Sequence, residues 1–407
     1  MDQKVRSSNL SPEVDRLTSF RLCKPTGESY HMYPTLACSG RYSVSVSQIR
    51  RPPLPVLTSL RFFAALSVVV FHVASGRSSD TLELDGFIKE LAIGGHSAVT
   101  FFFILSGFIL TYAHAGHSEV DNPDIKPSTF WRLRFARIVP AYFLGLLLAL
   151  PLLVDFLQSS APAWEKAVGP ILAVFFLQAW WPPVAEIWNY PAWSLSVEAV
   201  FYALFPWLSQ GSARLSRRWL FLVGYVLIAI ATACRAVPPI AGHPLIHHFP
   251  LFHLPLFIFG MALGRQFMFG RELSPQSHVA MFWLGVVALV LLFGFGSSLP
   301  SWTRSDAVLV LVFSLIIFGG ARPAGVVRQL SLPLWVLLGE ASYSIYILHV
   351  PLRMWWEGLE VGLPNELNLP LYFGTLLIVS ILSFQCVEKP LRKLLSTPRS
   401  RAALSAS

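Results

Sequence analysis

Two ionisable residues, Arg61 and His72, lie in the first long apolar stretch of the chain, residues 57–76. Inside a membrane, an ionisable group is costly unless it is paired or hydrated, so such residues are functional candidates. Their spacing of eleven residues makes about three helical turns, which puts both side chains on one face about 16 Å apart. A desolvated, neutral imidazole can take a proton from a hydroxyl group. His72 is therefore a candidate general base; the alternative is a packing histidine, with Arg61 reaching to the membrane surface.

A pair of arginines, Arg134 and Arg137, begins the third apolar stretch. Residues three apart share a helix face, so the two guanidinium groups could bind the phosphates of an anionic donor such as coenzyme A. The alternative is that they only mark a cytoplasmic loop, where basic residues accumulate in any membrane protein.

Small and polar residues interrupt the second apolar stretch at Ser106 and Gly107. Gly107 allows a neighbouring helix or a ligand to approach the backbone, and Ser106 can donate a hydrogen bond. A later stretch begins with Trp193 and Ser194 and contains Glu198. Glu198 favours the amino end of a helix, with Ser194 as its cap, or it orients a catalytic group and meets Arg61 or a sugar hydroxyl.

Two further polar residues, Tyr343 and His349, lie within one later apolar segment. A phenol and an imidazole on one span form either a polar lining or a pair of satisfied packing residues. The histidines near residue 248 have no metal-ligand pattern around them, and the four cysteines are scattered without a CxxC spacing. We predict neither a metal site nor a bound cofactor.

The elements that carry these residues are predicted to be membrane-spanning helices. Of the 407 residues, 54% are hydrophobic and 13% are charged, and apolar blocks of roughly 18 to 22 residues fit the length of a helix across a bilayer. The sequence therefore predicts an all-α transmembrane bundle with about ten spans. The predicted spans are 57–76, 92–114, 134–155, 193–209, 218–237, 250–268, 279–297, 305–320, 331–356 and 370–387.

Charge predicts the topology. If the short apolar block within 169–192 does not cross the membrane, most basic loops fall on the same, cytoplasmic side, as is usual in membrane proteins. We therefore predict that this block is re-entrant or interfacial. Both termini are then cytoplasmic, with a flexible amino-terminal tail at 1–52, a membrane domain at 53–395 and a carboxy-terminal tail at 396–407. The net charge of +9 comes from Lys and Arg residues that cluster in the connections between apolar blocks, as this topology requires. We therefore predict no nucleic-acid partner.

Six motifs in order give the chain a resemblance to a known family. They are Arg61 with His72, Ser106-Gly107-Phe108, Arg134-Phe-Ala-Arg137, Trp193-Ser-Leu-Ser-Val-Glu198, Ser342-Tyr-Ser-Ile-Tyr with His349, and Val387-Glu388-Lys389-Pro390. Over residues 55–395 this set resembles the membrane acyltransferase family 3, which modifies bacterial surface polysaccharides, lipopolysaccharide O-antigen and macrolides.

The resemblance implies a reaction and roles for the residues. It implies an acyltransferase of the bacterial inner membrane that moves an acetyl or other short acyl group from acyl-CoA to a hydroxyl of a glycan or glycolipid. His72 would be base or acyl acceptor, Arg61 its partner, and Arg134 with Arg137 the donor site. Many relatives have a second acid after the tryptophan motif, but Ala199 follows Glu198 here, which leaves Glu198 to act alone.

One expectation about partners and one rival function remain. Because the chain ends at Ser407, we expect transfer to finish in the membrane domain or on a separate extracytoplasmic partner. The rival function is a transporter or flippase of a glycan or an anionic small molecule, although the sequence lacks the matched halves that many transporters have.

Overall fold

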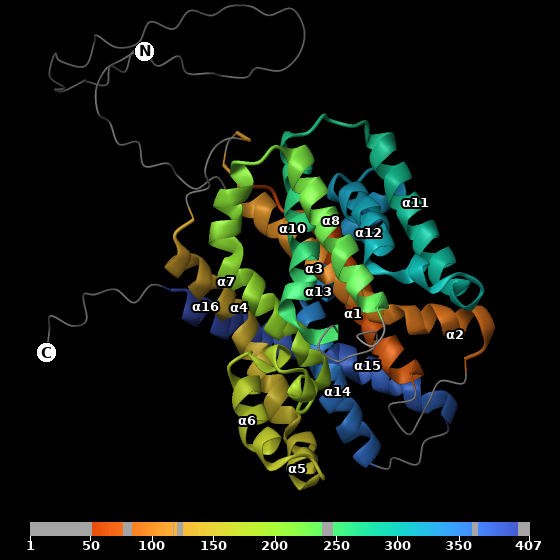
Figure 1. The fold of residues 1–407 in the computed structure, drawn as a ribbon. Coiled ribbons are helices and arrows are strands. Elements are labelled where there is room, and N and C mark those ends of the chain that lie inside the picture. The colour runs from red at the N-terminus through yellow and green to blue at the C-terminus, as the bar shows by residue number, and fades with distance from the viewer. Residues whose placement is uncertain are drawn as a thin grey trace, which may run out of the picture. The chain divides into compact units, whose positions relative to one another are not determined.

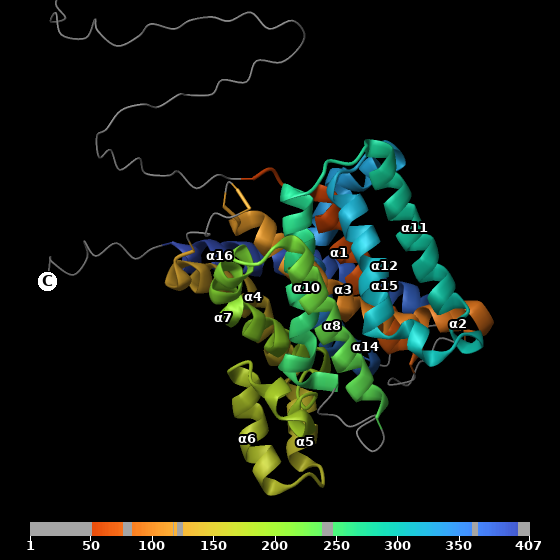
Figure 2. The same ribbon diagram turned by 45° about the horizontal axis from the view of Figure 1, so that its top comes forward.

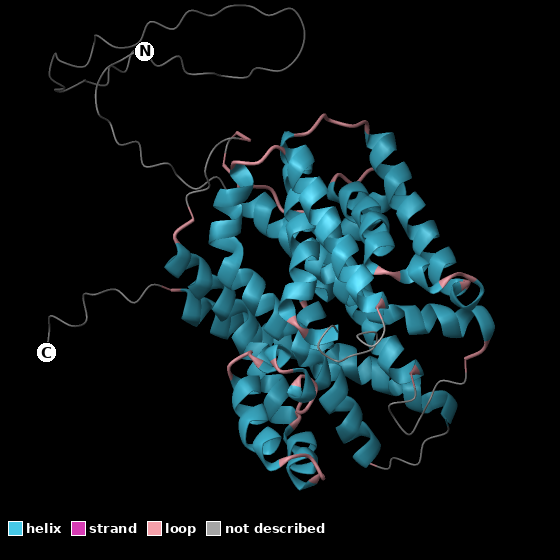
Figure 3. Cartoon of the chain, in the orientation of Figure 1, coloured by secondary structure: helices cyan, strands magenta, loops and turns pink. Residues whose placement is uncertain are grey.

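The computed structural model describes residues 51–75, 84–116, 118–119, 125–237, 247–359 and 365–397. Within these ranges every regular element is a helix and none is a strand (Figure 3). The predicted all-α class is therefore confirmed. The predicted amino-terminal tail, apart from residues 51 and 52, and most of the carboxy-terminal tail lie outside the described residues.

Long helices build most of the bundle (Figure 1). They are α1 (Pro55–Ala74), α3 (Ala98–His114), α4 (Pro127–Leu148), α7 (Trp193–Ala213), α8 (Arg217–Ala236), α10 (Pro250–Phe269), α11 (Pro275–Gly294), α12 (Asp306–Ala321), α14 (Ser342–Gly358) and α15 (Asn365–Ser383). The shorter ones are α2 (Gly86–Ile93), α5 (Leu150–Gln158), α6 (Ala163–Val174), α13 (Pro333–Glu340) and α16 (Lys389–Ser396). In Figures 1 and 2, α5 and α6 project together at one end of the bundle, and α16 lies beside α4.

Several of these helices are suited to a membrane. Within the described ranges, six are long and apolar enough to cross one, and the number rises to eight if each of two bent pairs forms one span. One pair joins α4 to α5 with a bend of 55°, where Pro151 follows the break at Ala149. The chain is thus a multi-pass membrane protein by length and composition, and the count of ten stays a prediction.

Two predicted segments differ in detail from single helices. The predicted span 331–356 divides into α13 and α14 at Ala341. Near the end of α13, Gly339 lies so close to α1 that a Cβ there would lie 2.0 Å from the Thr58 carbonyl oxygen. Segment 169–192 contains the end of α6 and three short 3₁₀ turns, Gln178–Trp180, Pro182–Val184 and Tyr190–Ala192. Its irregular backbone suits a re-entrant or interfacial segment, which remains a prediction.

A close helix contact joins α3 to α10 through small residues. A Cβ on Gly107 would lie 2.1 Å from the Phe257 carbonyl oxygen, and one on Gly260 would lie 2.1 Å from that of Ile104. Glycine at both positions allows the two backbones to touch, as is common between membrane helices. Gly107 is thus approached by a helix, which is one of the two alternatives left open by its sequence.

Prolines inside helices leave carbonyls that side chains then satisfy. Pro351 has no N–H, so the Ile347 carbonyl oxygen loses its helical donor and accepts instead from Asn189 Nδ2 at 2.8 Å. In the same way, Pro206 frees the Tyr202 carbonyl oxygen, which accepts from Trp131 Nε1 at 3.1 Å. These bonds fix α14 and α7, the helices that carry predicted site residues, against their neighbours.

Candidate active site

Most of the predicted site residues line one cavity. It has a volume of about 190 Å³ and lies among α1, α3, α4, α7 and α14; we call it the arginine cavity. Its predicted lining residues are Arg61, Ser106, Arg134, Arg137, Ser194, Glu198 and Tyr343. Five separate segments of the sequence thus converge on one space.

Positive charge dominates this cavity. Among the described residues, no carboxylate forms an ion pair with Arg61, Arg134 or Arg137. The Arg134 guanidinium carbon lies 5.4 Å from the ring centre of Phe130 and 5.9 Å from that of Tyr202. The buried Nε of Arg134 has no hydrogen-bond partner among the residues that the structure describes. Three partly buried like charges without a paired anion are unfavourable, so the cavity is suited to an anionic ligand.

The acid of the cavity, Glu198, is held by two hydroxyl groups. Its Oε1 accepts from Ser106 Oγ at 3.0 Å and from the Tyr202 hydroxyl, which links α3 to α7. Sequence reasoning assigned no role to Tyr202, although its spacing of four residues from Glu198 places it on the same helix face. Two charge-assisted hydrogen bonds orient the carboxylate within the cavity wall.

A second cavity continues from the first. Its volume is about 300 Å³, and it shares Thr58, Arg61, Arg137 and Tyr343 with the arginine cavity; we call it the basic vestibule. It adds two carboxylates and two cations: Glu340, Glu388, Lys389 and Arg392. The buried Glu388 ends a π-helical turn, Phe384–Glu388, and accepts a hydrogen bond from Ser344 on α14. The closing motif of the sequence therefore lies beside the arginines, which its position in the sequence did not indicate.

The two predicted histidines meet outside the arginine cavity. His72 Nδ1 lies 2.9 Å from His349 Nε2, and the ring centres are 5.0 Å apart. His349 Nδ1 lies 2.7 Å from the Tyr346 carbonyl oxygen, and the Tyr190 ring packs 4.9 Å from the ring of His72. The pair joins α1 to α14, whose histidines are far apart in the sequence.

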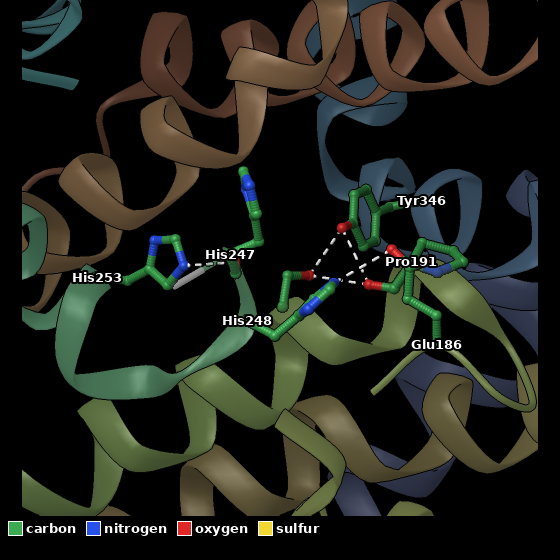
Figure 4. Close-up of polar contacts among 7 residues, drawn as sticks. Glu186, Pro191, His247, His248, His253 and Tyr346 are labelled. Atoms are coloured by element: carbon green, nitrogen blue, oxygen red, sulfur yellow. Dashed lines mark hydrogen bonds and ion pairs between the residues drawn. The ribbon is translucent and has the colours of Figure 1, made fainter. Parts of the chain in front are cut away.

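Tyr346 connects the histidine pair to the arginine cavity. It lines that cavity, and its ring centre lies 6.2 Å from that of His349. Its hydroxyl lies 2.7 Å from Ser194 Oγ and 3.1 Å from the Pro191 carbonyl oxygen (Figure 4). The prediction that Ser194 caps its helix is wrong: α7 begins at Trp193 after Ala192, and Ser194 bonds back to Pro191 and across to α14.

An aromatic and histidine cluster flanks this connection. Trp193 lies outside the arginine cavity, with its ring centre 5.0 Å from that of His248 and 5.5 Å from that of His253. His248 Nε2 lies 3.2 Å from the Glu186 carboxylate (Figure 4). Burial, together with the charge of Arg235, lowers the pKa of His247 and favours its neutral form. Trp193 thus packs among imidazoles rather than on the arginines.

Comparison of the sequence with known proteins identifies its family. The family model described as an acyltransferase domain matches residues 55–386. The chain belongs to this family. It is therefore an acyltransferase that transfers groups other than aminoacyl groups, which confirms the enzyme class predicted from the motifs and replaces the transporter alternative.

Curated relatives agree with this assignment. The acyltransferase is 28% identical over 320 residues to acyltransferase MdmB of Streptomyces mycarofaciens, a match that covers 73% of this chain and 78% of that protein. It is 30% identical over 310 residues to the exopolysaccharide production protein ExoZ of Rhizobium meliloti, covering 73% and 89%. It is 22% identical over 367 residues to the O-acetyltransferase OatA of Staphylococcus aureus, covering 84% of this chain but 57% of OatA. No solved structure matches the chain.

The site of this acyltransferase has two chemically different parts. The arginine cavity and the basic vestibule present cations that form no ion pair within the described part of the chain, and these can bind an anion such as a phosphate. The histidine pair presents imidazoles and can accept and return a proton. Arg61 and His72 lie about 16 Å apart along α1, so a ligand that reaches both must extend over about that distance.

Proposed function

We propose that this acyltransferase moves an acetyl or other short acyl group from acyl-CoA to a hydroxyl of a glycan or glycolipid. The relatives support an O-acyltransferase that acts on polysaccharide, since one is named an O-acetyltransferase and another an exopolysaccharide production protein. The site supports the choice of donor.

The observation that carries the proposal is the cluster of Arg61, Arg134 and Arg137 without carboxylate partners among the described residues. Coenzyme A carries its phosphates at one end and its thioester at the end of a long arm. Phosphates bound by these arginines and by Lys389 and Arg392 of the basic vestibule would compensate the clustered charge. The arm would then run along α1 toward His72, past Tyr346.

The proposed reaction uses His72 as the base. The imidazole takes the proton of the acceptor hydroxyl, and the oxygen attacks the thioester carbonyl carbon to form the new C–O bond. The C–S bond then breaks, and the leaving thiolate takes the proton back from His72, so that free CoA and the ester are the products. Glu198 orients the cavity wall through Ser106 and Tyr202 and balances part of the arginine charge.

The proposed membrane orientation rests on basic residues near the ends of helices. We propose that the ends of the helices bearing Arg137, Arg218 and Arg392 face the cytoplasm of an inner membrane, where acyl-CoA is available. His72 lies toward the opposite end of α1, so a cytoplasmic donor can serve an acceptor on the outer side, either directly or through a separate extracytoplasmic partner.

Purified protein in lipid nanodiscs tests this function. Given acetyl-CoA and a lipid-linked or soluble glycan, it should release free thiol and add an acetyl mass to the glycan. His72→Ala should abolish both signals, whereas His278→Ala, a change at a buried histidine of α11 bonded to the Phe318 carbonyl oxygen, should retain them. Acylation by His72→Ala protein that inserts normally would refute the proposed role of His72.

A further inference from the structure

We infer that His349 is a positioning residue that holds His72 in the tautomer with its proton on Nδ1 and its lone pair on Nε2. This inference rests on the proposed function, because it concerns the residue proposed there as the base. The observation behind it is a directed chain of two hydrogen bonds that starts at a backbone carbonyl and ends at His72.

The first bond fixes the tautomer of His349. Its Nδ1 lies 2.7 Å from the Tyr346 carbonyl oxygen, which can only accept a hydrogen bond, so Nδ1 must carry a hydrogen. The ring is 2% exposed, and no carboxylate of the described residues contacts it. A buried charge without a partner is costly in a membrane, so the ring is neutral and its Nε2 has the lone pair.

The second bond transmits this choice to His72. His349 Nε2 can only accept, and His72 Nδ1 lies 2.9 Å away, so His72 Nδ1 must donate. In a neutral His72 the remaining nitrogen, Nε2, therefore has the lone pair. This is the nitrogen that can take a proton from a hydroxyl; in the other tautomer it carries a hydrogen and cannot.

His349 can enforce this arrangement because its helix segment is held on several sides. The Tyr372 hydroxyl donates to the His349 carbonyl oxygen at 2.9 Å, and Asn189 Nδ2 donates to that of Ile347 at 2.8 Å. One turn away, the Tyr346 hydroxyl lies 3.1 Å from the Pro191 carbonyl oxygen. The acceptor atom facing His72 is thus set by the packing of α14 against α15 and the segment before α7.

The same bond also acts during turnover. When His72 has taken the acceptor proton, it still donates from Nδ1 to His349, whose lone pair faces the new positive charge. His349 touches no reacting atom in this scheme, and its effect is on the tautomer, the ring orientation and the stability of the protonated base.

Two substitutions separate the acceptor function of His349 from its bulk. His349→Met fills a similar volume but offers only a weak thioether acceptor, whereas His349→Gln places an amide oxygen near the position of Nε2. We expect His349→Met to lower kcat about 10- to 100-fold with little change in the KM for acetyl-CoA. His349→Gln should recover most of that loss, and the matched control His278→Met, at a residue also 2% exposed, should leave kcat unchanged.

A spectroscopic measurement reports the tautomer directly. In ¹⁵N-histidine-labelled protein in bilayers, one-bond N–H couplings should show the His72 hydrogen on Nδ1, with the resonance assigned by its loss in His72→Asn. In His349→Met this preference should disappear. The inference is overturned if the hydrogen resides on His72 Nε2 in the unmodified protein, if His349→Met keeps full kcat, or if Met and Gln lower kcat equally. Activity of His72→Ala would instead refute the proposed function itself, so the two failures are distinguishable.

Discussion

The hydrogen bond from Asn189 to the Ile347 carbonyl oxygen should stabilise the protein only as long as residue 351 is proline. The proline deprives that oxygen of its helical N–H donor, and Asn189 replaces the donor at 2.8 Å. In Asn189→Leu the carbonyl becomes a buried, unpaired acceptor, which costs about 1–3 kcal/mol. In a Pro351→Ala background, the new N–H of residue 351 can bond to Ile347 and the loss should vanish.

A double-mutant cycle isolates this interaction from other effects. Asn189 is 2% exposed and its own Oδ1 has no partner among the described residues, so Asn189→Leu also removes an unsatisfied acceptor, and this gain partly masks the loss in the single variant. The gain is the same in both backgrounds and cancels in the cycle. We expect a coupling energy of about 1–3 kcal/mol from unfolding of the four proteins in mixed micelles.

Activity should follow the same pattern as stability. Ile347 lies two residues before His349, so a displaced turn of α14 would move the imidazole that faces His72. Release of CoA should fall in Asn189→Leu and return in the double variant. Additive stabilities, within about 0.5 kcal/mol, would show that Asn189 does not serve the proline-freed carbonyl and would refute this account of α14.

Three further predictions concern the cavity and its walls. Arg137→Gln should raise the Kd for CoA about tenfold or more and weaken the dependence of this Kd on salt, as measured by calorimetry. The control Arg218→Gln, at the exposed start of α8, should change neither the Kd nor its salt dependence. Glu198→Ala should lower the thermal stability and the rate of acyl transfer, because it removes the acceptor shared by Ser106 and Tyr202. Glu198→Gln keeps an acceptor and should retain more of both. Equal losses in the two variants would contradict this reasoning. Gly107→Ala should destabilise the protein by about 1–3 kcal/mol, because its Cβ would lie 2.1 Å from the Phe257 carbonyl oxygen. The control Gly211→Ala, also in a helix but with nothing within 4 Å, should leave the stability unchanged or raise it by up to about 1 kcal/mol in the same unfolding assay.

Local features of the sequence were sufficient for the class of fold and for the choice of most candidate residues that line the arginine cavity. Apolar blocks of membrane length predict helices because each backbone polar group must be satisfied within its own segment in lipid. Ionisable residues in such blocks are costly, so their position in the sequence is enough to select Arg61, Glu198 and His72 as functional candidates. Arg134 and Arg137 share a cavity because three residues return a helix to nearly the same face.

Helix breaks and helix boundaries could be predicted less well from the sequence. The predicted span 331–356 is divided at Ala341, and the close approach of Gly339 to α1 joins two segments far apart in the chain. The expected Ser194 cap is absent, since α7 begins at Trp193 and the Ser194 hydroxyl bonds to Pro191 and to Tyr346 on α14. Hydropathy records the length and polarity of a segment, but not the neighbour that it meets.

The sequence by itself determined which residues are chemically suited to acyl transfer, namely the arginines, the acid and the two histidines. Only the tertiary structure decided that they form two groups, with seven predicted residues around the arginine cavity and His72 paired with His349 outside it. Helical periodicity fixes directions within one segment, whereas the pairing of α1 with α14 depends on side-chain packing between segments 277 residues apart. A hydrogen bond of 2.9 Å depends on that packing, and so, we infer, does the nitrogen from which His72 acts.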